Sequence, residues 1–494
     1  MPRMSYNAAS WLVDRHVERG DGERPAVVCG ETRLTYAELQ QQVWRVQHAL
    51  TELGVRRTER VVLVLDDGPV WLAWFLGCLR SGVVPVPLST MLTSAELAPV
   101  VDDAVAGVVV ASARHADKAT PTVIDLDGFD DLSEAPVAPT TEDSPGFWLY
   151  SSGTTGSPKG VMHRQYNLEA TAHALGETVL HATRDDRFLS VPKLFFAYGL
   201  GNSMTFPLAF GATTILNPEP STVAGLAALA EEHRPTVLAL GPGFIAGMLD
   251  AGLDPGVLAS VRVATSAGET LPADLHRRFT AHFGVPLLDA LGTTEALNCF
   301  LGNVEGRERP GTSGEAVPGY DIQLRNDADE RVDEPDTPGY LHVRGPSIAT
   351  GYWSRHAATQ AAFRGEWLKT GDVYTRSADG FFTFLGRNSD MIKAGGIWVS
   401  PAEVEAVLIS HPDVLEVGVV GLRDDHGLES VVAVVVARAG RTIDATSLEA
   451  HCRERMAAFK RPRKVVVADA LPKTATGKIR RFQLRDALAA GELG

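Results

Sequence analysis

Residues 150–160 read YSSGTTGSPKG, a turn rich in hydroxyl groups and glycine that directly follows the apolar run FWLY (147–150). Glycine lets the backbone approach a ligand closely, and exposed backbone N–H groups in such a turn form an anion-binding nest. The spacing differs from the Walker A pattern, because Pro158 stands where that pattern has its second glycine. A Ser/Gly linker, the alternative, would need neither a lysine nor a flanking strand. The stretch therefore predicts a loop that binds nucleotide phosphates through Ser151, Ser152, Gly153, Thr154, Thr155, Gly156 and Lys159.

Short apolar runs alternate with helical patterns over most of the chain. RVVLVLDD (60–67) is typical of a buried strand, and PVWLAWFLGCLRSG (69–82) of an apolar helix that ends at Gly82. The alternation recurs at 211–218, 235–249, 260–269 and 284–295, and it indicates an α/β fold with helix-covered, mostly parallel sheets. Ligands bind beyond the carboxyl ends of the strands in such sheets. We therefore expect the turns SSGTTG, SAGE and LGTTE to meet at one site, which adds the cofactor-binding candidates Ala267, Gly268 and Glu269.

The pattern changes after residue 311. Short alternating strands with Gly/Pro turns predict a small antiparallel or barrel-like part over 311–388. The last hundred residues predict a smaller α+β domain that ends in the basic tail LPKTATGKIRR (471–481). The expected domains are thus 1–388 and 389–494.

Composition excludes several classes of protein. The chain has 46 basic and 61 acidic residues and a net charge of −15, which argues against a nucleic-acid-binding surface. Its four cysteines lack metal-site or disulfide-framework spacing. No signal-peptide pattern is evident, and no run approaches the ~18–20 apolar residues of a membrane span. We expect a cytoplasmic protein with neither membrane nor nucleic acid as partner, and composition leaves monomer and dimer open.

Five motifs together carry a family resemblance. YSSGTTGSPKG, LGTTE (291–295), KTGD (369–372), GRNSDMIKAGG (386–396) and PKTATGK (472–478) resemble, in order and over essentially the whole chain, the motifs of the adenylate-forming superfamily. That group contains acyl-CoA synthetases, carrier-protein adenylation domains and luciferases. KLFFAYGLGNSMTFPLAFGA (193–212) and GGIWVSP (395–401) resemble its benzoate-CoA ligase branch, which activates aryl acids.

The resemblance implies a two-step reaction. A carboxylate attacks the α-phosphorus of ATP to give acyl-AMP and pyrophosphate, and a thiol, usually that of CoA, then displaces AMP. Singly, the matching residues have ordinary explanations: a neighbour of a helix N-cap, a turn aspartate and a solvated lysine. Their joint occurrence favours ligand roles. Glu295 is implied to hold Mg²⁺, Thr294 to face the α-phosphate, Asp372 and Arg387 to bind the ribose, and Lys478 to bridge the carboxylate and the α-phosphate.

The same resemblance places an aryl pocket. Ala197 and Tyr198 match positions that contact the ring, and Gly292 would form the floor, which makes a slot for a planar ring. Asn298 and Cys299 stand where benzoate ligases commonly carry His and Ile. A buried polar group without a partner costs about 1–3 kcal/mol. We hypothesise a ring hydroxyl or amino group near Asn298, or a bulkier acid in the space at Cys299.

The second step depends on a rotation of the C-terminal domain about a hinge. Ser389 stands where the family usually has Asp or Lys, and Gly395 and Gly396 resemble the glycines that line the pantetheine tunnel. The leading interpretation is an ATP- and Mg²⁺-dependent aryl acid–CoA ligase. The alternatives are an aryl-AMP ligase that passes the acyl group to a carrier protein or an amine, and a non-catalytic acyl-nucleotide-binding protein.

Overall fold

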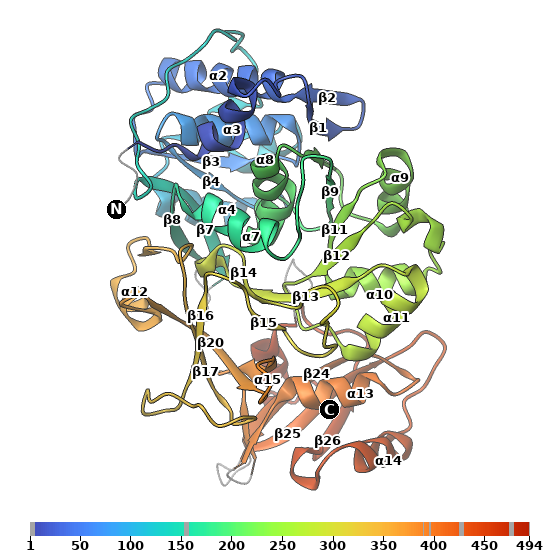
Figure 1. Cartoon of the computed structure of the whole chain (residues 1–494). Helices are drawn as coiled ribbons and strands as arrows, with labels where there is room; N and C mark the ends of the chain where they lie inside the picture. The colour runs from blue at the N-terminus through green and yellow to red at the C-terminus, as the bar shows by residue number, and fades with distance from the viewer. Residues whose placement is uncertain are drawn as a thin grey trace. The chain divides into compact units, whose positions relative to one another are not determined.

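The computed structural model describes residues 5–152, 158–388, 390–394, 397–423, 429–473 and 479–493. The chain folds into two compact units: a larger one, Met1–Ile322 with Val343–Leu368, and a smaller one, Gln323–His342 with Lys369–Gly494. The predicted domain boundary between 388 and 389 was placed at the expected hinge of a domain rotation, which the two units do not test, and it stays a prediction. Figure 1 shows the course of the chain.

A parallel four-stranded sheet confirms the first predicted strand–helix–strand unit. Its order is β4-β3-β5-β6, and α3 (Pro69–Arg80) connects β3 to β4. The α3 side chains are buried from Trp71 onward, proline starts the helix, and Gly82 follows it at φ +70°. Helix α2 (Tyr36–Glu52) packs so closely on α3 that a Cβ at Gly77 would lie 2.5 Å from Val46. The strands are β3 (Arg60–Val64), β4 (Val84–Pro87), β5 (Val108–Ala111) and β6 (Val123–Ile124).

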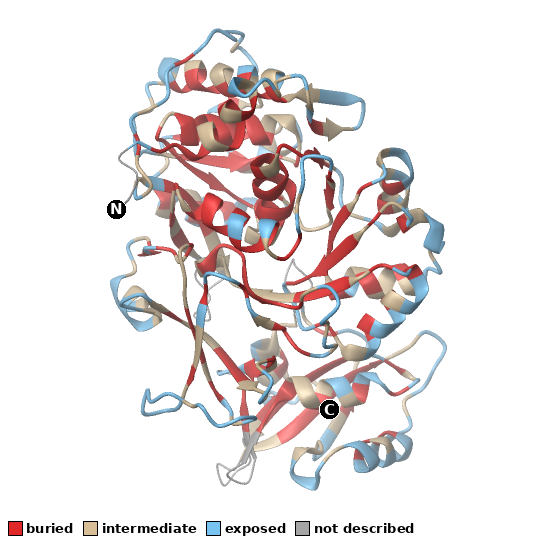
Figure 2. Ribbon diagram, in the orientation of Figure 1, coloured by how far each residue is buried: buried red, intermediate tan, exposed pale blue. Residues whose placement is uncertain are grey.

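A nine-stranded sheet forms the centre of the larger unit, in the order β15-β14-β13-β12-β11-β9-β10-β1-β2. The run from β13 to β1 is parallel, and antiparallel strands stand at both edges. Figure 2 shows the inner strands of the sheet largely buried, whereas the edge strand β2 is partly exposed. Since β12 and β13 are parallel neighbours, the SAGE and LGTTE turns follow adjacent strand ends, as predicted. The strands are β1 (Pro25–Cys29), β2 (Thr32–Thr35), β9 (Arg187–Ser190), β10 (Thr213–Ile215), β11 (Val237–Leu240), β12 (Val263–Ser266), β13 (Leu287–Gly292), β14 (Cys299–Gly302) and β15 (Glu315–Ala316).

The remaining helices of the larger unit are short. They are η1 (Ser10–Asp14), α1 (Arg15–Glu18), α4 (Ser94–Ala104), η2 (Ala113–His115), α5 (Ala116–Ala119), α6 (Asn167–Thr171), η3 (Ala172–Glu177), α7 (Ala197–Leu200), η4 (Gly201–Thr205), α8 (Phe206–Phe210), α9 (Val223–His233), α10 (Pro242–Asp250), η5 (Pro255–Leu258), α11 (Ala273–Phe283), η6 (Thr294–Ala296) and α12 (His356–Ala362).

The turn at 150–160 belongs to a different kind of sheet from the one expected. Strands β7 (Pro145–Ser152) and β8 (Pro158–Arg164) pair antiparallel, and β18 (Gly351–Tyr352) extends them in the order β18-β8-β7. The expectation that this turn follows a parallel strand is therefore wrong: it connects a hairpin. The apolar run FWLY does not reveal the direction of its partner, because alternating and continuous apolar patterns look alike over four residues.

The predicted antiparallel part after 311 is present. A five-stranded sheet has the order β16-β17-β20-β19, with β21 paired to β20. Its strands are β16 (Asp321–Arg325), β17 (Gly339–Arg344), β19 (Phe363–Arg364), β20 (Trp367–Arg376) and β21 (Phe382–Arg387).

The C-terminal part of the smaller unit is α+β, as predicted. Its sheet has the order β23-β22-β25-β24, with β26 paired to β25. Both faces of β25 are covered by helices. Alternate residues of the strand therefore belong to two separate apolar clusters, one packed against α13 and α14 and the other against α15. The elements are β22 (Ile392–Ala394), β23 (Ile397–Val399), α13 (Pro401–Ile409), β24 (Val414–Arg423), β25 (Glu429–Ala437), α14 (Ala445–Arg455), η7 (Ala458–Lys460), β26 (Lys464–Val467) and α15 (Arg481–Ala489).

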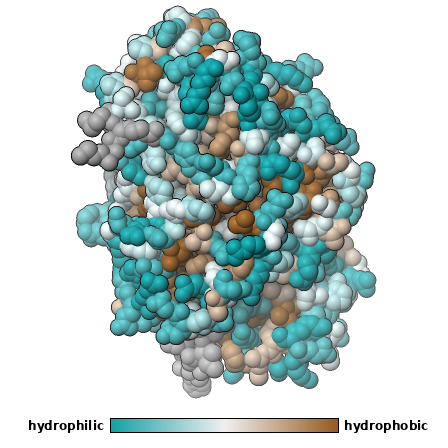
Figure 3. All heavy atoms as spheres, viewed as in Figure 1, coloured by the Kyte–Doolittle hydropathy of each residue, from teal (hydrophilic) through white to brown (hydrophobic). Residues whose placement is uncertain are grey.

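Hydrophilic side chains cover most of the face drawn in Figure 3, with small hydrophobic groups between them. Among the described residues, no helix is long and apolar enough to cross a membrane.

Candidate active site

Tyr352 joins the hairpin lysine to the glutamate of LGTTE within the larger unit. Its hydroxyl donates to Glu295 Oε1 (2.8 Å), and Lys159 Nζ lies 5.2 Å from the centre of its ring. Tyr352 pairs with Val161 of β8, so the segment that carries it is aligned with the hairpin by backbone hydrogen bonds. Two residues predicted from separate motifs, Lys159 and Glu295, are therefore brought together by a third that the motifs did not assign.

Hydrogen bonds from four directions hold the LGTTE turn. Thr293 caps the short helix η6 by accepting from the Ala296 backbone N–H (3.1 Å). The next three carbonyl groups each accept from a different donor: His163 Nε2 donates to Thr294 (2.9 Å), the Ala349 N–H to Glu295 (2.8 Å) and the Ser347 hydroxyl to Ala296 (2.6 Å). A turn whose carbonyl groups are bonded in this way presents the Thr294 and Glu295 side chains in a defined direction.

His163 is a neutral part of this support. Its ring is buried and stacks on Phe147, with centroids 5.0 Å apart. Burial lowers the pKa of His163 to about 3. Because Asn167 Nδ2 donates to Nδ1 (3.0 Å), the proton of the neutral ring is on Nε2, where it reaches Thr294. His163 thus positions the turn.

The hairpin is anchored through Tyr150, the first residue of its motif. The Tyr150 hydroxyl donates to Asp103 Oδ2 (2.8 Å), and Arg355 donates to Asp103 Oδ1 (2.7 Å). Gly160 faces the Tyr150 ring, and a Cβ there would come within 3.2 Å of it. The absence of a side chain at Gly160 therefore accommodates Tyr150, beside any role in backbone approach to phosphate.

The SAGE turn follows β12 beside LGTTE. Ala267 is buried, Gly268 has φ +91° and Glu269 is exposed. The left-handed backbone at Gly268 is one that side-chain-bearing residues rarely adopt, so the turn requires glycine there.

Ala197 and Tyr198 begin α7, and Tyr198 contacts β12; their role in binding the ring stays a prediction. The Tyr198 hydroxyl lies 2.6 Å from Thr265 Oγ1, and burial raises the pKa of Tyr198 well above its usual value. A Cβ at Gly292 would lie 2.5 Å from the Asn298 carbonyl oxygen, so only glycine fits at the predicted pocket floor.

Asn298 and Cys299, the two departures from the benzoate-ligase pattern, are both buried. Asn298 Oδ1 accepts from the Cys299 N–H (2.8 Å), and Nδ2 donates to the Ala197 carbonyl (3.3 Å). Burial raises the pKa of the Cys299 thiol to about 12, so it stays protonated. The hypothesis that Asn298 binds a ring substituent stays a prediction, but its amide oxygen already has a backbone partner.

Asp372 and Arg387 lie opposite each other in the smaller unit, on the antiparallel strands β20 and β21. Arg387 Nε is 2.9 Å from Asp372 Oδ1; Asp372 is buried, whereas the Arg387 side chain is half exposed. Two residues separated along the chain are thereby paired, and their predicted role in binding the ribose stays a prediction.

Several predicted residues lie outside the described part of the structure. These are Gly153, Thr154, Thr155, Gly156, Ser389, Gly395, Gly396 and Lys478, and for Ser152 only the backbone is described. Among the described residues, no cluster of three or more His, Cys, Asp or Glu could hold a metal ion.

Sequence reasoning did not assign Tyr352 or His163. Tyr352 stands in ATGYW (349–353), and His163 lies three residues after the end of the hairpin motif. The sequence carried no signal for either residue beyond the closeness of His163 to that motif.

Comparisons with known proteins identify the relatives of this chain. The family model described as AMP-binding enzyme matches residues 13–353, and the AMP-binding enzyme C-terminal domain matches residues 403–478. The benzoate–CoA ligase of Thauera aromatica is 39% identical, with 98% of this chain and 96% of that protein covered. The 4-hydroxybenzoate–CoA/benzoate–CoA ligase of Rhodopseudomonas palustris is 37% identical, with 99% and 96% covered.

A solved structure of a benzoate CoA ligase is also similar to this chain. The crystal structure of a benzoate CoA ligase from Burkholderia xenovorans LB400 superposes with a TM-score of 0.90 at 38% identity, covering 97% of this chain and all of that one. The chain belongs to the AMP-binding enzyme family, the adenylate-forming superfamily, in its benzoate–CoA ligase-like branch.

Proposed function

We propose that this protein activates an aryl carboxylic acid with ATP and then transfers the acyl group to the thiol of CoA. The observation that carries the proposal is the contact of Tyr352 with both Lys159 and Glu295. It puts a cation and a carboxylate from two motifs at one place, as Mg²⁺-bound triphosphate would require.

In the first step, a carboxylate oxygen of the acid forms a bond to the α-phosphorus of ATP. The bond from that phosphorus to the oxygen bridging to the β-phosphate breaks, and pyrophosphate leaves. The reacting groups are both anions, so their approach depends on positive charge and N–H donors. Lys159 supplies a charge beside the hairpin, His163 holds Thr294 in place, and Lys478 is proposed to bridge the two anions.

The residues present fit a magnesium ion. Glu295 supplies a carboxylate oxygen, which is the ligand type that this hard cation prefers, and phosphate oxygens and water would complete its shell. When bound, Mg²⁺ would neutralise charge on the phosphates. The Tyr352 hydroxyl bond to Glu295 holds one carboxylate oxygen and so orients the other.

In the second step, the thiol sulfur forms a bond to the acyl carbon, the bond from that carbon to the AMP oxygen breaks, and the thiol proton passes to solvent. Full-length similarity to CoA ligases supports CoA as the acceptor. Gly395 and Gly396 are proposed to line the pantetheine path, Ser389 to act as the hinge, and Asp372 with Arg387 to bind the ribose.

The test is pyrophosphate release with a panel of benzoates, followed by addition of CoA or of a phosphopantetheinyl carrier protein. We expect acid-dependent release, and acyl-CoA formation when CoA is added. Glu295→Gln should abolish most of the release, and Glu305→Gln, a change at an exposed glutamate, should not. No acid-dependent release with any aryl acid would refute the proposed function, and transfer to the carrier but not to CoA would refute the acceptor.

A further inference from the structure

A buried carboxyl group, that of Asp67, lies in the larger unit outside the family motifs, shortly after β3. Only 5% of the residue is exposed. Both carboxylate oxygens accept from the Leu194 backbone N–H, at 3.2 and 3.3 Å, and Oδ2 lies 3.9 Å from Lys193 Nζ. Burying a carboxylate costs free energy that one ion pair rarely offsets, so stability alone explains Asp67 poorly.

Lys193 connects the same point to the central sheet. Its Nζ donates to the carbonyl oxygens of Asn217 and Glu219, which follow β10, at 2.6 and 2.7 Å. Asp67 follows β3 of the four-stranded sheet, whereas Lys193 follows β9 of the nine-stranded sheet. The pair therefore ties residues 193–194 to the carboxyl ends of strands from both sheets.

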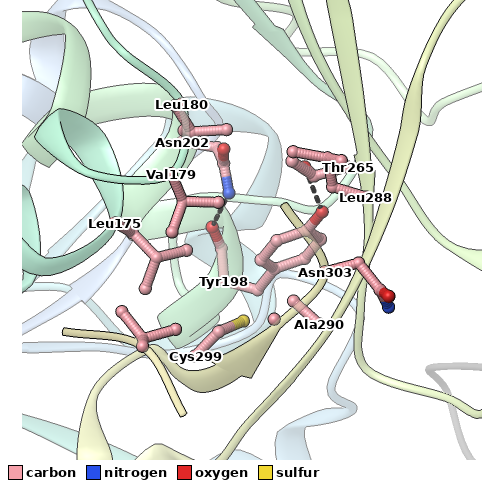
Figure 4. A pocket seen from close by; sticks show the side chains of 12 residues that line it. Leu175, Val179, Leu180, Tyr198, Asn202, Thr265, Leu288, Ala290, Cys299 and Asn303 are labelled. Carbon is pink, nitrogen blue, oxygen red and sulfur yellow. Dashed lines mark hydrogen bonds between the residues drawn. The ribbon is translucent and has the colours of Figure 1, made fainter. Parts of the chain in front are cut away.

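Residues 193–199 form a compact turn that carries the predicted ring-binding residues. A Cβ at Gly199 would overlap the Lys193 carbonyl oxygen, so the two ends of the turn are in direct contact. Figure 4 shows Tyr198, near the far end of the turn, with its hydroxyl directed at Thr265. Because the ends of the turn are packed on each other, contacts at its start help to set where Tyr198 lies.

The charge of Asp67 changes near neutral pH. Burial raises the pKa of Asp67 to about 7; Lys193 and the Leu194 N–H oppose this shift, and Asp66 adds to it. Cys29 is a further titratable neighbour among the described residues. Burial, and then the Asp67 charge, raise the pKa of the Cys29 thiol, which therefore stays protonated near neutral pH. Only the ionised form of Asp67 attracts Lys193 and accepts a charge-assisted bond from Leu194.

We propose that Asp67 is a positioning residue for acid binding: in its ionised form it holds the start of the 193–199 turn, and with it the ring-binding side of the acyl pocket. This inference rests on the proposed function. Asp67 acts through Lys193 and Leu194 and takes no part in the bond changes. It should therefore affect use of the acid more than use of ATP.

The first test is the pH dependence of kcat/KM for benzoate and for ATP in pyrophosphate release, over about pH 5.5–8.5, where benzoate stays ionised. In wild type, kcat/KM for benzoate should fall about tenfold or more as the pH falls through about 7, because Asp67 gains a proton. The value for ATP should fall less. Asp67→Asn keeps the size of the side chain and removes the charge. It should give the low benzoate value at every pH, without a transition.

Two further variants identify the group that titrates. Lys193→Met removes the opposite charge, which should raise the pKa of Asp67 and move the transition to higher pH. Asp66→Asn is the matched control, because Asp66 lies 3.2 Å from Arg114 Nε and 3.0 Å from His115 Nε2. It should keep the transition, at or slightly below the wild-type pH. Loss of the transition in this control would assign it to Asp66 with His115 and overturn the inference.

Amide hydrogen exchange of the peptide that contains Leu194 gives a measurement that needs no activity. At about pH 8, Asp67→Asn should exchange faster there than wild type, and Asp66→Asn should not. Unchanged exchange in Asp67→Asn, a wild-type transition in that variant, or equal losses for benzoate and ATP would each overturn the inference. If Asp67→Asn does not fold, an unmoved transition in Lys193→Met would overturn it. No release with any aryl acid would refute the proposed function instead, and the exchange experiment would then decide this inference.

Discussion

Replacing Tyr352 by phenylalanine tests how the glutamate of LGTTE is held. The change removes the hydroxyl that donates to Glu295 Oε1 at 2.8 Å and keeps the ring beneath Lys159. A hydrogen bond to a charged group contributes about 1.5–3 kcal/mol, which corresponds to about 10- to 150-fold in an equilibrium constant. Loss of a group that orients a metal ligand typically costs about 10- to 100-fold in metal affinity or activity. The hydrogen-bond energy and the effect of metal-ligand orientation thus predict a loss of similar size.

The assay is the Mg²⁺ dependence of pyrophosphate release at saturating ATP and acid. Tyr352→Phe should shift half-saturation to Mg²⁺ concentrations about 10- to 100-fold higher. Thermal unfolding of the variant shows whether the fold is intact. Tyr340→Phe is the matched control, because its hydroxyl also donates to a carboxylate, that of Asp327 (2.5 Å), in an exposed part of the smaller unit. Superimposable Mg²⁺ curves for wild type and Tyr352→Phe, or an equal shift in the control, would refute the reasoning.

Three further predictions concern His163, Asp372 and Lys478. The pKa of His163 is lowered from 6.5 to about 3 by burial, so between these values the unfolded chain binds the proton that the folded chain does not. His163 should therefore destabilise the fold as pH falls from 6.5 towards 3, by at most about 1.4 kcal/mol per pH unit. Thermal unfolding of His163→Gln should show a smaller loss of stability per pH unit than wild type, and an equal loss would contradict the prediction. Asp372→Asn, which breaks the 2.9 Å ion pair with Arg387, should lower kcat/KM for ATP about 10- to 100-fold. The same change at exposed Asp333 should not lower it, and equal kinetics of the two variants would contradict the ribose role. Lys478→Ala should cripple pyrophosphate release but spare thioester formation from supplied acyl-AMP, and equal loss in both steps would exclude a role confined to adenylation.

Local chemistry explains why so much of the fold followed from the sequence. The continuous apolar run of β3, and the apolar run of α3 between a proline and a glycine, are both patterns that short-range rules describe. The direction of β7 did not follow, because a strand's partner is decided by residues far along the chain.

The site residues also fall into a group that the sequence pointed out and a group that only the fold brought together. Lys159, Glu295, Asp372 and Arg387 stand in motifs whose order alone gave the family. His163 lies 131 residues from the carbonyl group that it holds, and Tyr352 lies 57 residues from Glu295. No local pattern encodes such distances.

What the sequence by itself determined is the α/β class and the family, and it named the motif residues that we propose as ligands, because these depend on short segments whose composition has few physical uses. Only the tertiary structure decided that the YSSGTTGSPKG turn joins antiparallel strands, that Tyr352 ties its lysine to Glu295, and that the Asn298 oxygen has a backbone partner while the Asn202 oxygen has none among the described residues. Whether a buried polar atom is satisfied depends on which distant segments fold around it, and that is settled only when the chain is packed.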